Sequence, residues 1–194
     1  MANIETIKKI REITGLSFKD IKNAIDHLNT DDETKIITYL REQGSLKAAN
    51  RADRVTGQGR IFTYVHEGRI GVMLEMRCET DFVSRGDVFK QYGNDIALHI
   101  AAMQPMFLSQ NDVHQEFIDS EMDIAKKLLL DEGKPADKIE MILQNKMQKI
   151  KDDVSLLGQA FFKDAKKSIQ DVVNELSQAT GEKVEITRFS LYKL

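Results

Sequence analysis

The spacing of apolar residues changes along this chain, and that change limits the folds that it can adopt. Up to about residue 54, apolar residues recur at three- and four-residue intervals, which is typical of helices that bury one face. Residues 55–59 contain two glycines that interrupt this pattern, and apolar and polar residues then alternate as in strands. Helical spacing returns from residue 86. The order of the segments predicts an α+β fold with a small antiparallel sheet packed with helices.

Three apolar stripes at helical spacing predict a bundle of short helices in residues 1–43. Helices of this length are marginal alone, so they should pack together. Gly44 is expected to end the third helix, and residues 44–59 are expected to form a linker helix and a glycine-containing hinge. The bundle resembles ubiquitin-associated modules, which are general binding domains. The stripes consist of Ile4, Ile7, Ile10 and Ile13, then Phe18, Ile21, Ile25 and Leu28, then Ile36, Ile37 and Leu40.

Residues 60–194 are expected to form one α+β core domain. Residues 67–69, Glu-Gly-Arg, lie between two alternating runs and predict a hairpin turn. Residues 86–104 and a segment near 168–179 have helical spacing. The alternation of residues 183–192 predicts that the last strand joins the same sheet.

Residues 116–152 predict an antiparallel helical hairpin inserted into the core domain. Gly133 is expected to end its first helix, and Pro135 can open the second helix at its first turn. The outer faces of both helices are almost entirely charged or amide-bearing. The hairpin should therefore project into solvent.

Composition excludes several classes of protein. A net charge of -3, from 28 basic and 31 acidic residues, does not indicate binding to nucleic acid or to an anionic membrane. No apolar run approaches the ~18 residues of a membrane span, and charges within the first ten residues argue against a secretory signal. The single cysteine, Cys78, excludes a disulfide within the chain. We therefore expect a cytoplasmic protein.

No arrangement of residues predicts covalent chemistry. The histidines have no metal-ligand spacing among themselves or with Cys78. The Gly-Gln-Gly at 57–59 precedes a strand and lacks the rest of a dinucleotide fingerprint, and Gly133-Lys134 lacks the upstream glycine of a phosphate-binding loop. We expect no enzyme, no metal and no cofactor. The histidines are His27, His66, His99 and His114.

Residues 77–87 place an acid and a large aromatic, Asp81 and Phe82, side by side in a short connection. Connections lie on surfaces because their backbone groups need water or partners. Phe82 could pack back into the junction of sheet and helix, with Asp81 capping the next helix. Alternatively, Phe82 is held out for another molecule. Spacing alone favours the first interpretation.

Four stretches, taken in order, resemble the elongation factor Ts family. Residues 7–25 are similar to its N-terminal helix pair, and residues 64–72 to a strand pair bearing a histidine. Residues 78–89 look like its Cys-x-Thr-Asp-Phe-Val signature, and residues 132–150 like its Gly-Lys-Pro helical hairpin. Together they cover nearly the whole chain at consistent spacing. The chain resembles the short form of the family, with a single core lobe.

The resemblance implies a guanine-nucleotide exchange factor for the translational GTPase elongation factor Tu. It implies that Asp81 and Phe82, flanked by Thr80 and Val83, enter the GTPase near its nucleotide-bound magnesium, so that GDP leaves and GTP binds. It favours Phe82 being held out, and it implies binding to the GDP-bound and nucleotide-free partner, without membrane or direct nucleic acid. Further partner contacts are implied for Arg11, Phe18, Lys19, Lys22 and His66.

Several alternatives remain open. Phe18 also fits a packed helical stripe, and His66 also fits a solvated strand position. A different function, that of an adaptor for RNA or the ribosome, would use the helical bundle and nearby arginines, with an affinity that falls steeply with salt. Those arginines are Arg51, Arg54 and Arg60. The single lobe also suggests a homodimer. It would have to form without the C-terminal cysteine bond of some short members, because this chain has Ser190 there.

Overall fold

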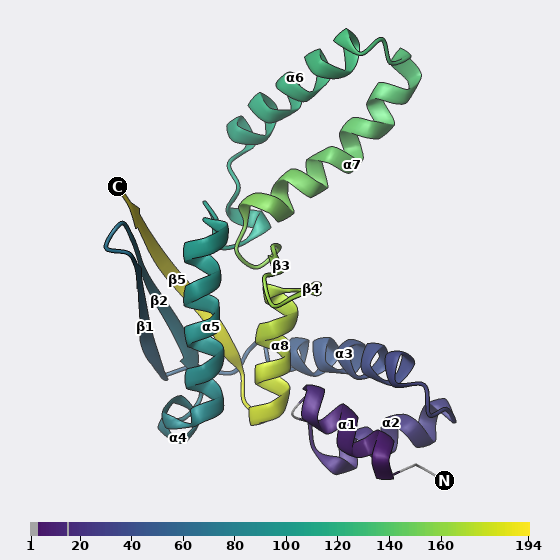
Figure 1. Cartoon of the computed structure of the whole chain (residues 1–194), viewed down its shortest axis with the longest axis vertical. Coiled ribbons are helices and arrows are strands. Elements are labelled where there is room, and N and C mark those ends of the chain that lie inside the picture. The colour runs from purple at the N-terminus through teal and green to yellow at the C-terminus, as the bar shows by residue number, and fades with distance from the viewer. Residues whose placement is uncertain (1–3, 15) are drawn as a thin grey trace.

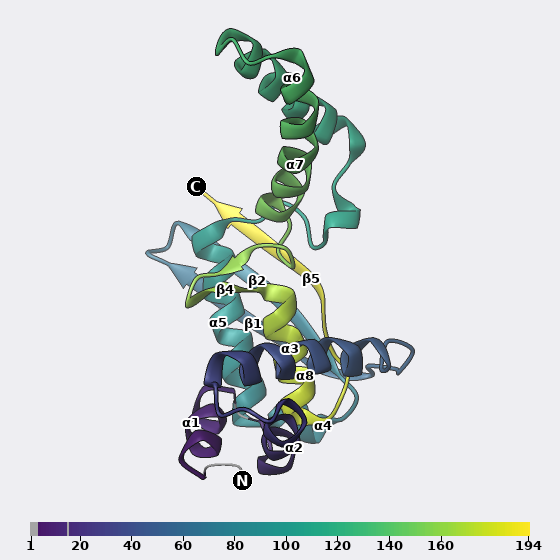
Figure 2. The ribbon, with the colours of Figure 1, turned by 90° about the vertical axis from the view of Figure 1, so that its right-hand side faces the viewer.

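A computed structural model describes residues 4–14 and 16–194 of the chain. Figures 1 and 2 show three parts, which are an N-terminal helical bundle, a sheet with helices on one face, and a helical hairpin that projects from the core. The bundle lies at one end of the molecule and the hairpin tip at the other. The α+β expectation is confirmed.

The bundle consists of α1 (Ile4–Thr14), α2 (Phe18–Leu28) and α3 (Glu33–Ala49). Ser17 caps α2, since its side chain accepts a hydrogen bond from the amide of Asp20. Residues three apart are separated by about 300° around a helix, so a stripe of period three drifts across its surface. The predicted stripe of α1 accordingly has its middle buried and its ends exposed. Its buried members are Ile7 and Ile10, and its exposed members are Ile4 and Ile13.

The predicted helix break at Gly44 is wrong, because α3 continues through it to Ala49. Residues 44–49 are helical, but they are the last turns of α3 rather than a separate linker helix. The glycine allows a close approach to α8 (Ile169–Thr180), where a Cβ at Gly44 would lie 2.6 Å from Oε1 of Gln178. A glycine within a helix costs only about 1 kcal/mol, which packing against α8 offsets.

The main sheet has three antiparallel strands in the order β1-β2-β5. Glu67 and Gly68 both have positive φ, and the amide of Arg69 donates to the carbonyl of His66 at 2.9 Å, as in a type I′ turn. The predicted hairpin turn is therefore confirmed. The last strand also pairs with the sheet as predicted. The strands are β1 (Gln58–His66), β2 (Ile70–Cys78) and β5 (Val184–Lys193).

Helices α5 (Asp87–Met103) and α8 pack on one face of this sheet (Figure 1). Alternate residues of β2 point into the core that they form, as the two-residue period requires. These residues are Val72, Leu74, Met76 and Cys78. The other elements are α4 (Asp81–Arg85), η1 (Gln110–Asp112), β3 (Ala160–Phe161) and β4 (Asp164–Ser168).

The projecting hairpin consists of α6 (Gln115–Asp131) and α7 (Ala136–Val154), and it confirms the predicted antiparallel pair. Gly133 has a φ of 71° in the turn, where a left-handed backbone favours glycine. At the base of the hairpin, the amide of Leu156 donates to the carbonyl of Phe107 at 2.8 Å. That contact ties the end of α7 to the chain segment that follows α5.

His99 on α5 is the centre of a buried polar network beneath the hairpin. Its Nδ1 accepts a hydrogen bond from the amide of Phe162 at 3.4 Å, so its Nε2 carries the proton and donates to Gln159 Oε1 at 3.1 Å. The side-chain amide of Gln159 then donates to the carbonyls of Met103 and Asp153. The network requires a neutral imidazole and joins α5 to the end of α7.

Lowering the pH from 7 to 5 is expected to reduce the free energy of unfolding through His99. Burial lowers the pKa of His99, while the hydrogen bond to Gln159 raises it less. The unfolded chain, with a histidine pKa of about 6.5, therefore binds the proton more readily than the folded protein, and stability falls by up to about 1.4 kcal/mol per pH unit below that value. Urea unfolding at each pH would measure this slope. The slope should flatten in His99→Gln, and an unchanged slope would contradict the assignment.

Candidate functional site

In the short connection between β2 and α5, Asp81 and Phe82 are the first two residues of the short helix α4. Thr80 is the N-cap of this helix, and its Oγ1 accepts from the amide of Val83 at 3.4 Å. The hydroxyl of Ser84 donates to the carbonyl of Asp81 at 3.0 Å. A threonine cap followed by an acid in the first turn explains why a helix begins here.

Phe82 points away from the core, with 85% of its surface exposed. The next residue, Val83, is buried in the main core and fixes the other face of α4. Asp81 is exposed and forms an ion pair with Arg85 at 3.2 Å. The alternative in which Phe82 fills the junction and Asp81 caps the helix is therefore wrong. Thr80 is the cap, and α4 presents an acid and an aromatic to solvent.

The turn before α4 is held by Glu182, which follows α8. One carboxylate oxygen of Glu182 accepts from the amides of Glu79 and Thr80 at 3.1 and 3.0 Å, and the other accepts from the hydroxyl of Thr80 at 2.6 Å. In return, Glu79 accepts from the amide of Lys183 at 2.6 Å and pairs with Arg54 at 3.1 Å. The hydrogen bond from Lys183 is the main reason that the pKa of Glu79 is lowered.

Sequence reasoning missed both Glu79 and Glu182. Glu79 occupies the unspecified position of the Cys-x-Thr-Asp-Phe-Val signature, Glu182 belongs to no motif, and 102 intervening residues separate the two. The signal that could have found them is strand pairing, because Cys78 at the end of β2 pairs with Val184 at the start of β5. That register places Glu79, which follows β2, beside Glu182 and Lys183, which precede β5.

The bundle residues expected to contact a partner are all exposed and lie on two adjacent helices. Phe18, the first residue of α2, is 48% exposed, so it does not share the burial of Ile21 and Ile25 on the same helix. Figures 1 and 2 show the bundle and α4 at the same end of the molecule, away from the hairpin tip. The expected contact residues are Arg11 on α1 and Phe18, Lys19 and Lys22 on α2.

The structure does not bring His66 close to Asp81 and Phe82. His66 ends β1, whose first residue pairs with the end of β2 that leads to α4. Because β1 has nine residues, about 26 Å separate its two ends. The ring of His66 is exposed, and its Nδ1 forms a hydrogen bond with the hydroxyl of Tyr64 at 3.1 Å. Any contact made by His66 is therefore separate from those of α4.

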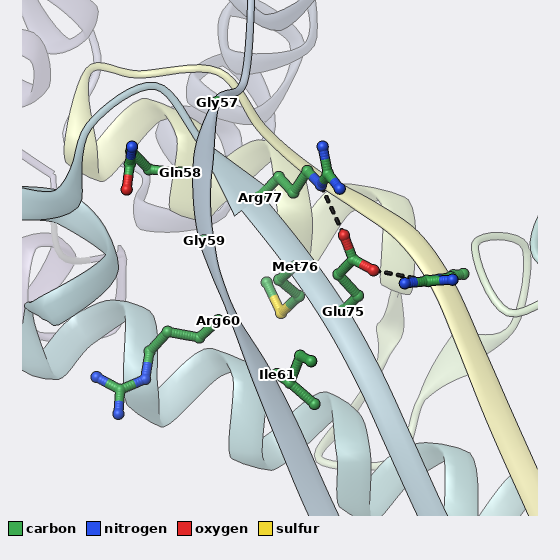
Figure 3. Close-up of a pocket in the computed structure, with 9 residues that line it drawn as sticks. Gly57, Gln58, Gly59, Arg60, Ile61, Glu75, Met76 and Arg77 are labelled. Carbon is green, nitrogen blue, oxygen red and sulfur yellow. Dashed lines mark hydrogen bonds and ion pairs between the residues drawn. The ribbon is translucent and has the colours of Figure 1, made fainter.

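A shallow hollow on the outer face of the sheet is lined by charged side chains (Figure 3). The carboxylate of Glu75 lies between Arg77 and Arg188 and accepts from each Nε at 2.6 Å. The hydrogen bond from Arg188 contributes most to lowering the pKa of Glu75, and that from Arg77 contributes next. The pair of Glu75 with Arg188 joins β2 to β5, and Arg77 adds a contact within β2. Nothing in this arrangement combines a nucleophile with a base.

Comparison with known proteins identifies the family of the chain. A family model described as elongation factor TS matches residues 3–194. The chain belongs to the elongation factor Ts family. Curated relatives with that name are each 43% identical: one from Leptospira biflexa serovar Patoc over 98% of this chain and 96% of its own, and one from Fervidobacterium nodosum over 95% and 94%. Another, from Syntrophomonas wolfei, covers 100% of this chain and 91% of its own length at the same identity.

Membership of the elongation factor Ts family supports, in general terms, a role in translation as a nucleotide exchange factor of elongation factor Tu. Such a role makes and breaks no covalent bond. Among residues 4–14 and 16–194, no group of three or more His, Cys, Asp or Glu side chains could hold a metal ion. Over that part of the chain, no helix is long and apolar enough to span a membrane.

Cys78, which begins the signature of the elongation factor Ts family in this chain, has a structural environment. It is fully buried in the core and its thiol donates to the carbonyl of Thr80 at 3.2 Å, so it supports the turn before α4. Burial, followed by the charge of Glu182, raises the pKa of the thiol to about 11. Cys78 therefore serves as a small buried side chain of the core.

Cys78 is expected to react with a thiol-specific disulfide reagent at pH 8 at least about a hundredfold more slowly in the folded protein than in the unfolded chain. The thiolate is the reactive form, and a pKa of about 11 leaves very little of it. Since the chain has one cysteine, the reaction reports this site alone. Rapid labelling without denaturant would contradict the buried position of the thiol.

Proposed function

We propose that this chain binds elongation factor Tu in its GDP-bound and nucleotide-free states and promotes GDP release by inserting α4 near the magnesium and the nucleotide. The observation that carries the proposal is the exposure of Phe82, at 85%, on a helix whose other face is buried through Val83. A large apolar side chain held in water in this way gains free energy only when a partner covers it.

Burial of Phe82 in the partner would supply roughly 1.5–3 kcal/mol. If the pocket for Phe82 exists only when the ligands of magnesium and phosphate are displaced, that energy weakens the binding of GDP. Coupling between two ligands is reciprocal, so bound GDP weakens the binding of the factor by the same amount. Asp81 brings a negative charge to the same place, where it opposes the negative phosphates.

The N-terminal bundle would provide a second contact, which Arg11, Phe18, Lys19 and Lys22 make with the partner. Phe18 supplies exposed apolar surface, and the three basic side chains are exposed around it. His66 would contact the partner separately, from the far end of the sheet. Contacts at several places are needed because one aromatic side chain shifts a binding equilibrium by only about tenfold to some hundredfold.

The adaptor for RNA or the ribosome is the less favoured function. Arg54 pairs with Glu79, and the guanidinium of Arg51 donates to the carbonyl of Ser177 at 3.0 Å. These two arginines therefore have roles within the chain. We accordingly propose that the protein acts in the cytoplasm on a protein partner, without direct contact with nucleic acid.

A homodimer is a further part of the proposal. The face of the sheet opposite α5 and α8 exposes apolar side chains, and a two-fold dimer could bury the same face on each copy. Light scattering across a concentration series would measure the mass, alone and with elongation factor Tu. A monomer mass in both cases would contradict the dimer. The exposed side chains are Ile61, Val65, Met73 and Tyr192.

Stopped-flow release of fluorescent GDP from elongation factor Tu tests the main proposal. The chain should accelerate release, and excess magnesium should reduce that acceleration, since the magnesium site is proposed to be displaced. Excess GDP should weaken the complex between factor and GTPase, as reciprocity requires. A release rate that does not depend on the concentration of this chain would contradict the proposal. Steep loss of binding to a short RNA with salt would instead favour the adaptor.

A further inference from the structure

We propose that Glu182 is a positioning residue for nucleotide exchange, which sets the orientation of α4 and thereby of Phe82. This inference rests on the proposed function of α4. Glu182 lies outside α4, so it would act through the turn at Glu79 and Thr80 rather than through contact with the nucleotide.

Phe82 does not hold itself in place. Its side chain is 85% exposed, so its direction is inherited from the backbone of α4. That helix has five residues, and helices of this length are not stable alone. It is attached to the core through the buried side chains of Val83 and Ser84, the continuation into α5, and the capped turn at Thr80.

Glu182 accepts hydrogen bonds from both amides and the hydroxyl of that turn. The donor–acceptor distances of these three hydrogen bonds to the carboxylate lie between 2.6 and 3.1 Å. Hydrogen bonds to an ionised acceptor are roughly twice as strong as neutral ones. Without the carboxylate, two consecutive amides lose their acceptor, and the Thr80 hydroxyl that caps α4 loses the bond that orients it.

The segment that carries Glu182 is itself fixed. Gly181 ends α8 with a φ of 76°, a left-handed conformation that turns the chain toward β5. The hydroxyl of Ser177 donates to the carbonyl of Glu182, and the amide of Glu182 donates to Thr180 Oγ1 at 3.4 Å. The carboxylate of Glu182 thus comes from a short segment that is held between α8 and β5, both of which pack in the core.

The same segment also holds the end of the bundle. Arg51, which follows α3, donates to the carbonyl of Ser177 at 3.0 Å, and Lys183 Nζ donates to the carbonyl of Ala52 at 2.8 Å. Residues 177–183 therefore support both α4 and the connection from α3. The two regions proposed to contact the GTPase share one support, which sets their separation.

The test compares Glu182→Ala and Glu182→Gln with wild type in GDP release, over a range of factor concentrations. Glu182→Ala should lower the maximal rate by about tenfold or more, while the half-saturating concentration changes by less than about threefold. The reason is that interactions made only on the way to release affect the maximal rate and not the initial binding. A glutamine at position 182 can still accept hydrogen bonds from the two amides and donate one to the hydroxyl of Thr80. Glu182→Gln should therefore have a maximal rate within about threefold of wild type.

Hydrogen exchange of the Thr80 amide gives a readout that does not depend on activity. It should be faster in Glu182→Ala and near the wild-type rate in Glu182→Gln. Glu140→Ala, an exposed acid on α7, is the matched control and should change neither the exchange of Thr80 nor GDP release. If Glu182→Ala does not fold, Thr80→Val keeps both amide bonds and removes only the hydroxyl, and should lower the maximal rate by about threefold.

Each failure has a distinct meaning. If wild type does not accelerate GDP release, the proposed function is overturned, and the positioning role with it. If wild type is active and Glu182→Ala keeps the full maximal rate, only the positioning role is overturned. A variant that shifts the half-saturating concentration at an unchanged maximal rate would also overturn it, because Glu182 would then be part of the initial contact surface.

Discussion

Phe82→Ala is expected to lower the maximal rate of GDP release from elongation factor Tu by about 10- to 100-fold, because truncation removes roughly 1.5–3 kcal/mol of burial in the partner. The folded chain should lose no stability, since the side chain is 85% exposed and makes little contact with its own core. The measurements are stopped-flow GDP release at saturating factor and thermal unfolding of the factor alone. A loss of activity without a loss of stability separates a role in the partner from a role in the fold.

The matched control is Phe162→Ala. Phe162, between β3 and β4, is another exposed phenylalanine, but it packs beside His99 and away from α4. This control should reduce stability and leave the maximal rate of GDP release unchanged. Asp81→Asn removes the charge beside Phe82 and keeps the shape of the Asp81 side chain. It therefore measures how much the charge contributes to the acceleration of GDP release. A Phe82→Ala variant with the wild-type maximal rate would contradict insertion of this side chain.

Gly93→Val is expected to destabilise the protein by about 3 kcal/mol, which lowers the melting temperature of a domain of this size by roughly 6–12 °C. Gly93 lies in the middle of α5 against Phe62 of β1, and a Cβ there would lie 2.2–2.5 Å from three carbons of the ring. The ring is buried and packs against Phe89, so it has no free space to occupy. Thermal and urea unfolding would measure the loss.

Gly71→Val is the matched control, because a Cβ at Gly71 meets nothing within 4 Å and valine suits a strand. That variant should unfold within about 0.5 kcal/mol of wild type. Adding Phe62→Leu to Gly93→Val should recover part of the loss, since the smaller side chain makes room. Purely additive effects of the two substitutions would contradict the contact between Gly93 and Phe62.

Local chemistry made parts of the fold predictable. The switch to a two-residue period and the turn at Glu67-Gly68 indicated the hairpin of β1 and β2. Gly133 and Pro135 likewise indicated the turn between α6 and α7. Gly44 misled the prediction because glycine both ends helices and permits close packing, and only the position of α8 decides between these roles. The small sheet of β3 and β4 was missed because Asp164–Ser168 is mostly polar and its partner has two residues.

The candidate site was predictable in a different way. Asp81 and Phe82 were selected by resemblance to the elongation factor Ts family, and their exposure could not be derived from spacing. Exposure follows from the burial of Val83 and Ser84, which turns Phe82 away from the core. Glu182 was not predictable from nearby residues, because its role follows from the pairing of β2 with β5 across more than a hundred residues of sequence.

The late position of β5 in the sequence has a consequence for biosynthesis of the chain. During synthesis, α4 and the first two strands leave the ribosome well before Val184–Lys193. Until that strand pairs with β2, the carboxylate that orders the turn at Thr80 has no fixed place beside it. In nascent or C-terminally truncated chains, the orientation of Phe82 would therefore not be fixed. If Glu182 positions α4 as proposed, chains whose synthesis has not reached β5 should promote GDP release more slowly.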